Sequence, residues 1–472
     1  MSRHSSVSEM SDLEAVRADV VVVGAGLAGL TAAVQLQRGG LSVVLVEARE
    51  QVGGRAHTVL VANERVDIGG QWLGPTQHQI LRIVEELGIE LEEQEWPGMV
   101  DGGVSMAAVA GFGPPETTEE ELQDIQRVND EIVRLQATVS VHAPWEAECA
   151  AEWDQLSVDD FLVQQCKTAV SLREWRLMVS SVLAEEPYRV SFLYFLAFLQ
   201  TNGGVDACDD GPNGAQKYKV KGGVGSVAAG MASWLKEGTI FLCSPVSRIE
   251  RWNSDEVEVL TPTRKFLARR VVLTCPPIVT DDIVFRPPLP ISKADVLRSS
   301  PMGVAVKVIA MYSSPFWLDV SPPSQKAPHF SDLGPMTNIF HSKPGRFVGL
   351  VGLIVGDRAR EFLRLDPLTQ RSLVLQQLAT VYSSEAALTP IAFTCVDWRK
   401  EEFSQGCYAA YAPPGLLTRC GAAIRAPTGC LHWAGTFTST VWAGYFEGAV
   451  VSGQRAATEV LQELSVPPRP RL

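Results

Sequence analysis

The chain is poor in the residues that hold metals or build disulfide frameworks. Its 472 residues include 7 histidines, without metal-ligand spacing, and 9 cysteines, an odd number that contains no C-x-x-C pair. Small secreted proteins rely on paired cysteines, and zinc sites place them at short fixed intervals. The sequence therefore predicts free thiols in a reducing compartment and no metal site.

Long hydrophobic runs and an excess of basic charge are also missing. No run approaches the ~18 apolar residues that a membrane-spanning helix needs. The net charge of −13 argues against nucleic acid and anionic membranes as partners. Residues 1–17 are polar, lack the apolar core of a secretion signal, and are expected to form a disordered lead. Together these absences predict a soluble, cytoplasmic protein, and its length favours two domains.

The first informative stretch is residues 18–40, which predict a buried strand, a glycine-rich turn and a helix. Residues 20–23 are four consecutive valines, as a central parallel strand requires. Gly24, Gly26 and Gly29 follow with G-x-G-x-x-G spacing. The first glycine permits the tight turn, the second lets a pyrophosphate approach the backbone, and the third lets helix and strand pack closely. The helix N-terminus then offers unpaired N–H groups to a phosphate.

A second apolar strand, residues 42–46, ends at Glu47. An acidic residue at this place in a dinucleotide-binding fold bonds the ribose hydroxyls. Glycines alone would fit an ordinary tight turn, but the two strands and the acid favour a dinucleotide site. The loop Gly53-Gly54-Arg55 comes next and suits a second phosphate contact, with a surface turn as the alternative.

The middle of the chain changes character after residue 92. Residues 114–150 are acidic and predict helices with loops, and residues 153–200 alternate apolar and polar residues at helical spacing. The aromatic residues at 192–198 fit a core better than a ligand site. Residues 240–242, 246–251, 257–259 and 271–273 predict a small sheet, with an exposed basic hairpin at 264–270.

One lysine, Lys307, lies in the apolar strand 304–310. Burying it costs several kcal/mol unless it finds a partner or loses its proton, which points to a function. The alternative is an edge lysine that reaches water.

Several separated stretches, in this order, resemble the flavin-dependent monoamine oxidases over residues 18–463. The motifs that carry the resemblance are Val23-Gly24-Ala25-Gly26-Leu27-Ala28-Gly29-Leu30, Glu47-Ala48-Arg49, Gly53-Gly54-Arg55, Asp67-Ile68-Gly69-Gly70-Gln71-Trp72-Leu73-Gly74-Pro75-Thr76-Gln77, Gly222-Gly223, Lys307 before Pro315-Phe316-Trp317, Ser404-Gln405-Gly406-Cys407-Tyr408, Trp433-Ala434-Gly435-Thr436 and Trp442-Ala443-Gly444-Tyr445-Phe446-Glu447-Gly448-Ala449.

The resemblance implies a fold of α/β plus α+β class. A discontinuous, Rossmann-like FAD-binding domain would comprise residues 18–91, 221–297 and 401–463. A mixed α+β substrate domain would be inserted as residues 92–220 and 298–400, and residues 464–472 would form a C-terminal tail. The membrane-anchoring C-terminal helix of the mitochondrial members has no counterpart here, and a homodimer is compatible with the resemblance.

The resemblance also implies which positions contact FAD. Glu47 would bind the ribose, Val246 the adenine, and Cys407 would bond covalently to the flavin, with a small buried thiol as its alternative role. The other cofactor positions would be Gly24, Gly26, Ala28, Gly29, Arg49, Gly54, Arg55, Gly70, Gln71, Trp72, Trp398, Thr436, Phe437 and Phe446. At Phe437 the family usually has glutamate, so one polar contact near the flavin is in doubt.

The catalytic positions that the resemblance implies are Lys307, Tyr408 and Tyr445. The two tyrosines would face each other as an aromatic cage that holds the amine, and Lys307 would hold a water near flavin N5. Gln216 and Leu353 would line the substrate cavity.

The expected reaction is oxidative deamination by hydride transfer from the amine α-carbon to flavin N5. It converts amine, O2 and water into aldehyde, ammonia and hydrogen peroxide. A polyamine oxidase, an amino-acid oxidase and a non-catalytic flavin-binding module remain alternatives. The first would need carboxylates in the cavity and the second an arginine.

Overall fold

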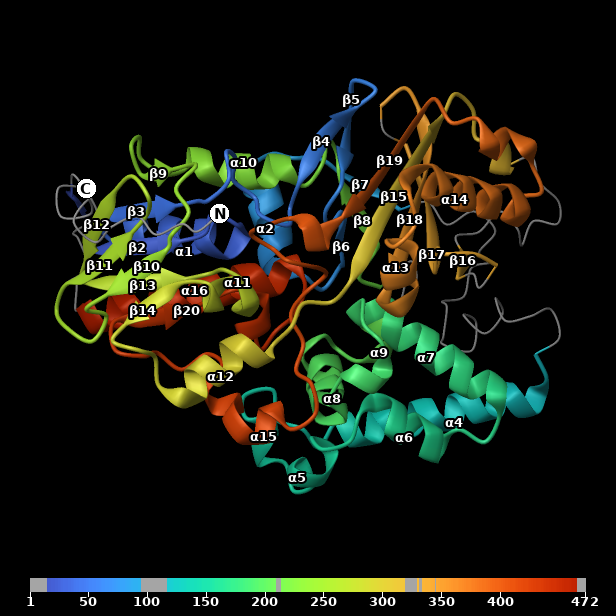
Figure 1. The fold of residues 1–472 in the computed structure, drawn as a ribbon, viewed down its shortest axis with the longest axis horizontal. Helices are drawn as coiled ribbons and strands as arrows, with labels where there is room; N and C mark the ends of the chain where they lie inside the picture. Colours follow the sequence, from blue (N-terminus) through green and yellow to red (C-terminus); the bar gives the residue numbers. More distant parts are fainter. Residues whose placement is uncertain are drawn as a thin grey trace.

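The structure is a computed structural model that describes residues 15–94, 117–208, 214–318, 329–330, 333–343 and 345–464. Residues 1–14 of the expected lead and the tail from residue 465 lie outside these ranges. In Figure 1 the parallel sheet with its helices occupies one half, and an antiparallel sheet and a helical group occupy the other.

The parallel sheet carries the glycine-rich motif. Its strands, in spatial order, are β20 (Leu431–Trp433), β13 (Arg270–Leu273), β2 (Val20–Val23), β3 (Val43–Val46) and β9 (Ile240–Phe241). Successive side chains of a strand point to opposite faces. Val20 and Val22 therefore pack with helices α1 (Leu27–Arg38) and α16 (Phe446–Leu464), and Val21 and Val23 face a second sheet.

The second sheet corrects two expectations. Its strands are β1 (Ala15–Arg17), β12 (Lys265–Ala268), β11 (Val257–Leu260), β10 (Arg248–Glu250) and β14 (Val284–Arg286). Residues 15–17 belong to a strand, not to a disordered lead, because they pair in parallel with β12. The stretch 264–270 is not an exposed hairpin. Phe266 and Leu267 are buried, and the chain passes at Arg269 from this sheet to the parallel one.

The third five-stranded sheet, which is antiparallel, forms one wall of the site described below. Its strands are β16 (His329–Phe330), β17 (Asn338–Ser342), β18 (Val348–Val355), β15 (Ala305–Tyr312) and β19 (Ala392–Asp397). Helices α13 (Gly356–Phe362) and α14 (Pro367–Val381) cover one face. The opposite face, which includes Ile309 and Leu353, packs toward Trp398 and Cys407.

A helical group packs beside this sheet. Its helices are α4 (Glu119–Gln136), α5 (Ala150–Trp153), α6 (Val158–Gln165), α7 (Ala169–Leu183), α8 (Phe192–Thr201) and α9 (Val205–Cys208). Thr118 and Ser157 start α4 and α6 with reciprocal capping boxes. Phe192 and Phe195 are completely buried, which confirms the prediction that the aromatic stretch belongs to a core.

Shorter elements connect these parts. They are β4 (Thr58–Val61), β5 (Glu64–Asp67), β6 (Trp72–Leu73), β7 (Leu91–Glu93), β8 (Tyr218–Val220), α2 (His78–Glu86), α10 (Gly225–Ser233), α11 (Pro277–Asp281), α12 (Ile291–Ser299) and α15 (Leu416–Cys420).

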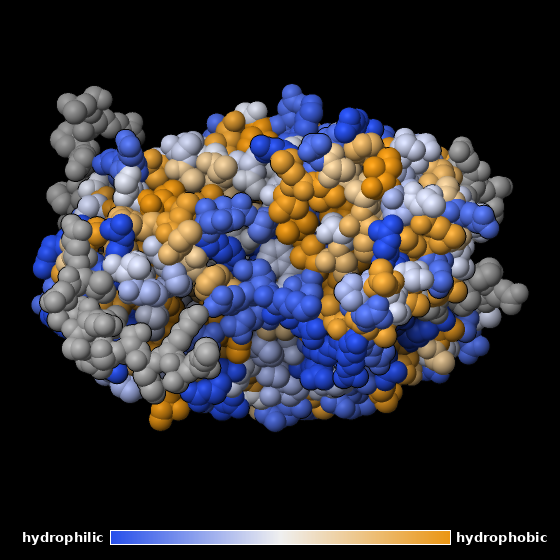
Figure 2. All heavy atoms as spheres, turned by 45° about the horizontal axis from the view of Figure 1, so that its top comes forward, coloured by the Kyte–Doolittle hydropathy of each residue, from blue (hydrophilic) through white to orange (hydrophobic). Residues whose placement is uncertain are grey.

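The hydropathy of one face of the molecule and of the described helices bears on contact with a membrane. On the face seen in Figure 2, hydrophobic side chains form separate patches that hydrophilic residues divide. Within the described ranges, every helix is too short or too polar to cross a bilayer.

Candidate active site

A cavity of about 560 Å³ lies at the carboxyl ends of β2 and β3. Its lining combines residues of the parallel sheet, such as Val23 and Val46, with residues of the antiparallel sheet, such as Lys307 and Phe340. Open parallel sheets commonly bind ligands at this edge. In the part of the chain that the structure describes, no group of three or more His, Cys, Asp and Glu residues could hold a metal ion.

The glycine-rich turn presents backbone to this cavity. Gly24 has a φ of +99°, and a Cβ at Gly29 would lie 1.9 Å from the Gly24 carbonyl oxygen, so neither position accepts a side chain easily. Gly26 is the N-cap of α1 and supplies no side-chain cap, which leaves the first helical N–H groups available. Gly53 donates its N–H to the Ala25 carbonyl over 2.8 Å, so the two glycine loops lie side by side.

Glu47 sits at the end of β3, 3 % exposed. Its Oε2 accepts the Ala25 N–H over 2.7 Å, and its Oε1 accepts the Arg49 N–H over 3.0 Å. The Arg49 guanidinium pairs with Glu401 and donates to Ser404 Oγ over 3.0 Å. These bonds join the turn after β2, the end of β3 and residues 401–404 into one wall.

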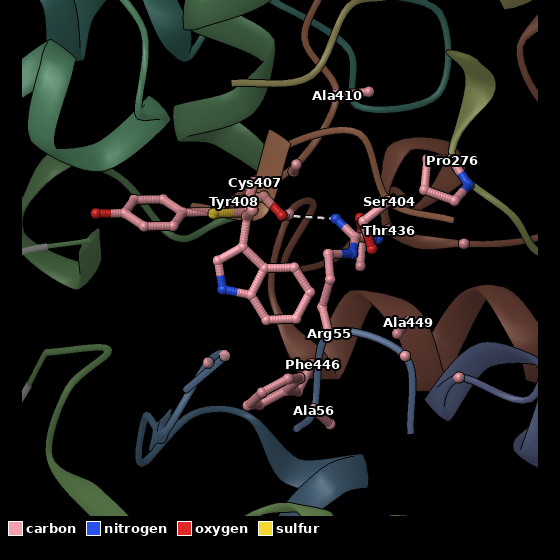
Figure 3. A pocket seen from close by; sticks show the side chains of 18 of the residues that line it. Arg55, Ala56, Pro276, Ser404, Cys407, Tyr408, Ala410, Thr436, Phe446 and Ala449 are labelled. Atoms are coloured by element: carbon pink, nitrogen blue, oxygen red, sulfur yellow. Dashed lines mark hydrogen bonds between the residues drawn. The ribbon is translucent and has the colours of Figure 1, made fainter. Parts of the chain in front are cut away.

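The guanidinium of Arg55 contacts a backbone carbonyl oxygen rather than a carboxylate. It donates to the Tyr408 carbonyl oxygen over 2.6 Å, as Figure 3 shows. Within the described ranges no carboxylate lies within ion-pair distance of it, and burial lowers the pKa of Arg55 from its usual value. A buried guanidinium needs an anion. Since Arg55 lies beside the uncapped N-terminus of α1, the donor set fits the pyrophosphate of FAD.

Cys407 and Tyr408 stand together in the cavity wall. Gly406 has a φ of +144°, and a Cβ there would lie 2.6 Å from the Gly303 carbonyl oxygen, so the approach of this segment to the residues just before β15 requires glycine. Cys407 is 8 % exposed, and burial raises the pKa of its thiol to about 12. The thiol, which Figure 3 shows beside Tyr408, is therefore neutral at physiological pH.

Neighbouring residues hold the aromatic rings of Tyr445 and Trp398 in place. The Tyr445 ring stands edge-on to Trp442, with centroids 4.9 Å apart, and lies 6.4 Å from the Phe198 ring centroid. Trp398 is held by a 2.9 Å bond from its Nε1 to the Ile68 carbonyl oxygen. Tyr408, Tyr445 and Trp398 all line the cavity, so it contains several oriented aromatic surfaces.

Lys307 reaches the cavity from the middle of β15 and is 4 % exposed. Its Nζ donates to the Gly69 carbonyl oxygen over 2.9 Å and to Gln71 Oε1 over 2.5 Å. Burial lowers the pKa of Lys307 to about 8, against the opposing effect of Asp67. The structure thus places the lysine in the interior, as the strand pattern predicted, rather than at a sheet edge.

A model of the flavin-containing amine oxidoreductase family matches residues 27–461. A flavin-containing amine oxidase of Oncorhynchus mykiss is 34 % identical over 96 % of this chain and 88 % of its own length. Amine oxidase B of Sus scrofa is 32 % identical over 95 % and 87 %. This chain belongs to the flavin-containing amine oxidoreductase family. It is an oxidoreductase that uses FAD to deaminate amines oxidatively.

Solved structures of amine oxidases have the same fold. A putrescine oxidase variant from a structure-based redesign of cofactor binding superposes with a TM-score of 0.87 and 28 % identity, over 95 % of this chain and 100 % of that one. Cyclohexylamine oxidase from Brevibacterium oxydans superposes with a TM-score of 0.84 and 28 % identity, over 95 % and 99 %. The α/β plus α+β architecture is that of FAD-dependent amine oxidases.

The cavity collects most of the positions that the resemblance selected. The predicted positions that line it are Gly24, Gly26, Ala28, Glu47, Arg49, Gly54, Arg55, Gly70, Gln71, Trp72, Gln216, Val246, Lys307, Leu353, Trp398, Cys407, Tyr408, Thr436, Tyr445 and Phe446. Gly29 lies behind the turn, where it permits close packing. Phe437 lines a small neighbouring cavity and packs against Tyr194, with ring centroids 6.3 Å apart.

Sequence reasoning missed part of the lining. The helical group contributes Met178, Ser181, Val182, Leu183, Tyr194, Phe198, Val205 and Cys208, and the antiparallel sheet contributes Asn338 and Phe340. The aromatic positions of α8 were assigned to a core, and Phe198 both belongs to that core and faces the cavity. The helical spacing shows only that a face is apolar, so it does not separate these two roles.

Alanine at Gly26 and at Gly29 should separate cofactor binding from folding. The nearest neighbour of a Cβ at Gly26 is the Gly53 carbonyl oxygen at 3.9 Å, so the Gly26→Ala protein should fold. Its methyl group would occupy the pyrophosphate approach, and we expect it to retain little FAD. Gly29→Ala should lose about 1–3 kcal/mol of stability, because its Cβ meets the Gly24 carbonyl. Circular dichroism melts and the flavin-to-protein absorbance ratio check both; stoichiometric FAD in Gly26→Ala would contradict the assignment.

Proposed function

We propose that Tyr408, Tyr445 and Lys307 form the catalytic part of the cavity, and that the substrate is a monoamine with an apolar body. The observation that carries this proposal is that all three side chains line the same cavity as the Glu47, Arg49 and Arg55 wall. Cofactor residues and candidate catalytic residues thus share one space.

Bound FAD would supply an acceptor for the α-hydrogen of the amine, formally a hydride, and a route for the electrons to O2, which yields hydrogen peroxide. The imine product hydrolyses to an aldehyde and ammonia. In the proposal, Glu47 would hold the ribose, Arg55 and the N-terminus of α1 the pyrophosphate, and Trp398 would pack against the flavin. Cys407 would supply a thioether bond.

The tyrosines would orient the amine and exclude water from it. The contacts of Tyr445 with Trp442 and Phe198 keep its ring in place, so little conformational freedom remains to be lost when the amine binds. Burying an ammonium ion among these aromatic rings without a carboxylate partner costs free energy. The cavity therefore favours the neutral amine, whose lone pair assists loss of the α-hydrogen.

Lys307 would hold a water molecule and a positive charge near the reacting atoms. Two of the three N–H donors of its ammonium group bond to the Gly69 carbonyl oxygen and to Gln71 Oε1. The third would bind water, and the charge would stabilise the electrons that O2 receives.

The substrate class follows from the charges of the lining. The described carboxylates that line the cavity are Glu47, Asp282 and Glu402, and its described arginines are Arg49 and Arg55. All five come from the stretches that the resemblance assigns to FAD binding. The described lining residues of 92–220 and 298–400 include no aspartate, glutamate or arginine. This composition supports a monoamine over a polyamine or an amino acid.

A peroxide assay with an amine panel tests the proposed function. The panel would contain 2-phenylethylamine, a linear alkylamine, putrescine, spermidine and an L-amino acid. We expect peroxide release from the first two and at least ~10-fold lower kcat/KM for the others, because an unpaired charge would have to be buried. Preference for putrescine would contradict the monoamine assignment. No release with any amine, despite bound flavin, would favour a non-catalytic flavin-binding module.

Two finer expectations belong to the same proposal. The protein should be soluble in the cytoplasm, and a homodimer is the assembly to test. Light scattering after size-exclusion chromatography, together with fractionation of the native cells, checks both.

A further inference from the structure

Two uncharged acceptors hold the side-chain nitrogen of Lys307 in the cavity wall. Its Nζ donates to the Gly69 carbonyl oxygen over 2.9 Å and to Gln71 Oε1 over 2.5 Å. Among the described residues, no carboxylate lies within ion-pair distance of this nitrogen. A neutral amine has two N–H donors and one lone pair. Neutral Lys307 therefore keeps both bonds and has a lone pair that neither acceptor occupies.

The surroundings of Lys307 favour this neutral form. The residue is 4 % exposed, and burial lowers its pKa to about 8. Asp67 and Cys407 oppose the effect of burial, Lys219 adds to it, and the Cys407 thiol is itself neutral. At pH 8 about half of the Lys307 side chains therefore carry a free amine, against roughly 0.4 % of exposed lysines with an ordinary pKa.

The cavity that contains this amine also receives an electrophile. Lys307 lines the same cavity as Tyr408 and Tyr445, between which the proposed function places the substrate amine. Oxidative deamination converts that amine into an imine and then into an aldehyde. Both products have an electrophilic carbon, and a desolvated neutral lysine is the form that adds to such carbons. The reaction thus brings an electrophile into a cavity whose wall carries a nucleophile.

We propose that Lys307 captures the aldehyde product as a Schiff base, so that the enzyme is reversibly inhibited by its own product. The Nζ lone pair forms a bond to the carbonyl carbon, both Nζ protons pass to the carbonyl oxygen, and that oxygen leaves as water while C=N replaces C=O. No electrons are gained or lost, and addition of water reverses the step.

The inference rests on the proposed function, which places the reacting amine in the part of the cavity that Lys307 lines. It gives the same nitrogen a second chemical role. The adduct would occupy the position to which the proposed function assigns a water molecule, so captured product would block the step that Lys307 assists. Because only the neutral amine adds to a carbonyl, capture should strengthen as pH rises through about 8.

Trapping with a reductant tests the adduct directly. The holoenzyme would be incubated at pH 8 with phenylacetaldehyde, the aldehyde expected from 2-phenylethylamine, and with sodium cyanoborohydride, which reduces an imine to a stable secondary amine. Peptide mass spectrometry should find Lys307 heavier by the mass of the aldehyde less one oxygen atom. We expect Lys307 to be modified at least ~10-fold faster than the exposed Lys221, because far more of its amine is neutral.

Lys293 is the matched control for access to the cavity. It is 2 % exposed and burial lowers its pKa to about 7, but it does not line the cavity. A lowered pKa alone would make both lysines reactive, whereas we expect Lys307 to be modified at least ~10-fold faster than Lys293. Equal modification of Lys293, or a rate at Lys307 no higher than at Lys221, would overturn the inference. Lys307→Arg, which keeps a cation but has no free amine, should leave this peptide unlabelled.

The inhibition itself has a pH signature. After preincubation with phenylacetaldehyde, the aldehyde concentration that halves peroxide formation should be about 25-fold lower at pH 8.5 than at pH 6.5, which is the ratio of neutral Lys307 at the two values. Dilution should restore the activity, and equal concentrations at both pH values would contradict capture by the amine. Trapping uses added aldehyde and needs no turnover. If no amine releases peroxide, the proposed function fails, and the mass spectra still decide whether Lys307 binds the aldehyde.

Discussion

Lys307→Met should slow the reoxidation of the amine-reduced enzyme by O2 about 100-fold, the usual effect of removing one electrostatic group from a reaction centre. The FAD content and the rate of reduction by amine should stay close to those of the wild type. The physical reason is that the buried Nζ is fixed by Gly69 and Gln71 and carries a cationic charge in the wall of the cavity that the tyrosines also line. Stopped-flow mixing of the anaerobically reduced protein with aerated buffer measures the rate.

The pH dependence of reoxidation adds a second readout. Burial lowers the pKa of Lys307 to about 8, Asp67 and Cys407 oppose this effect, and Lys219 adds to it. The charged fraction, and with it the reoxidation rate, should fall as pH rises through about 8, whereas the methionine variant should show no such fall. The same shift lowers stability below pH 8, where the folded protein must bury the charge, and this cost fades between pH 8 and the unfolded value near 10.5.

Lys293 provides the matched control for this experiment. It is 2 % exposed, lies 4.1 Å from the centroid of the Trp433 ring, and burial lowers its pKa to about 7. It does not line the cavity. Lys293→Met should therefore alter stability without slowing reoxidation. Wild-type reoxidation in Lys307→Met, or equal slowing in both variants, would show that Lys307 has no specific role.

The elements that the sequence predicts well depend on local patterns. Four consecutive valines, a glycine turn and a helix stopped by Gly39 follow one another, and the structure has β2 and α1 at these positions. Lys307 was recognisable because a single cation interrupts an apolar strand. In each case neighbouring residues contain the physical cause, and distant partners only complete it.

The elements that were missed depend on long-range pairing. Residues 240–273 look like one small sheet, but β9 and β13 join the parallel sheet and β10, β11 and β12 join the second. The alternation of side chains gives the face of a strand and not its partner. Ser181 and Asn338 are 157 positions apart, so their hydrogen bond has no signature in either local stretch.

Phe437 shows how a motif predicts a position but not a side-chain direction. The resemblance put it among the flavin contacts, whereas its ring packs against Tyr194 and it does not line the main cavity. Tyr194 lines that cavity. Where a glutamate would need a buried hydrogen-bond partner, phenylalanine supplies packing between the segment after β20 and α8.

Precipitation with acid should leave the flavin of the wild-type protein in the pellet and that of Cys407→Ala in the supernatant. Cys407 is the buried thiol beside Tyr408, and we propose that its Sγ forms a thioether with the 8α-methyl carbon of the flavin. The thiol would lose its proton in forming the bond, and the two electrons released with the methyl hydrogen have O2 as their final acceptor. Absorbance of the two fractions near 450 nm, a flavin band, measures the partition.

Cys275 makes this experiment specific, because it is a second thiol of the same kind in the same cavity. It lines the cavity at the end of β13, and burial raises its pKa to about 12, as it does for Cys407. Acidity therefore does not distinguish the two thiols, although Cys407 is the more deeply buried of the two, and the difference that we expect to matter is their position in the cavity. Cys275→Ala should keep a yellow pellet, whereas Cys407→Ala should bind FAD through the Glu47 and Arg55 wall and release it on denaturation. A colourless wild-type pellet would mean that this member holds FAD by those non-covalent contacts alone, and flavin retained by denatured Cys407→Ala would assign the bond to another residue.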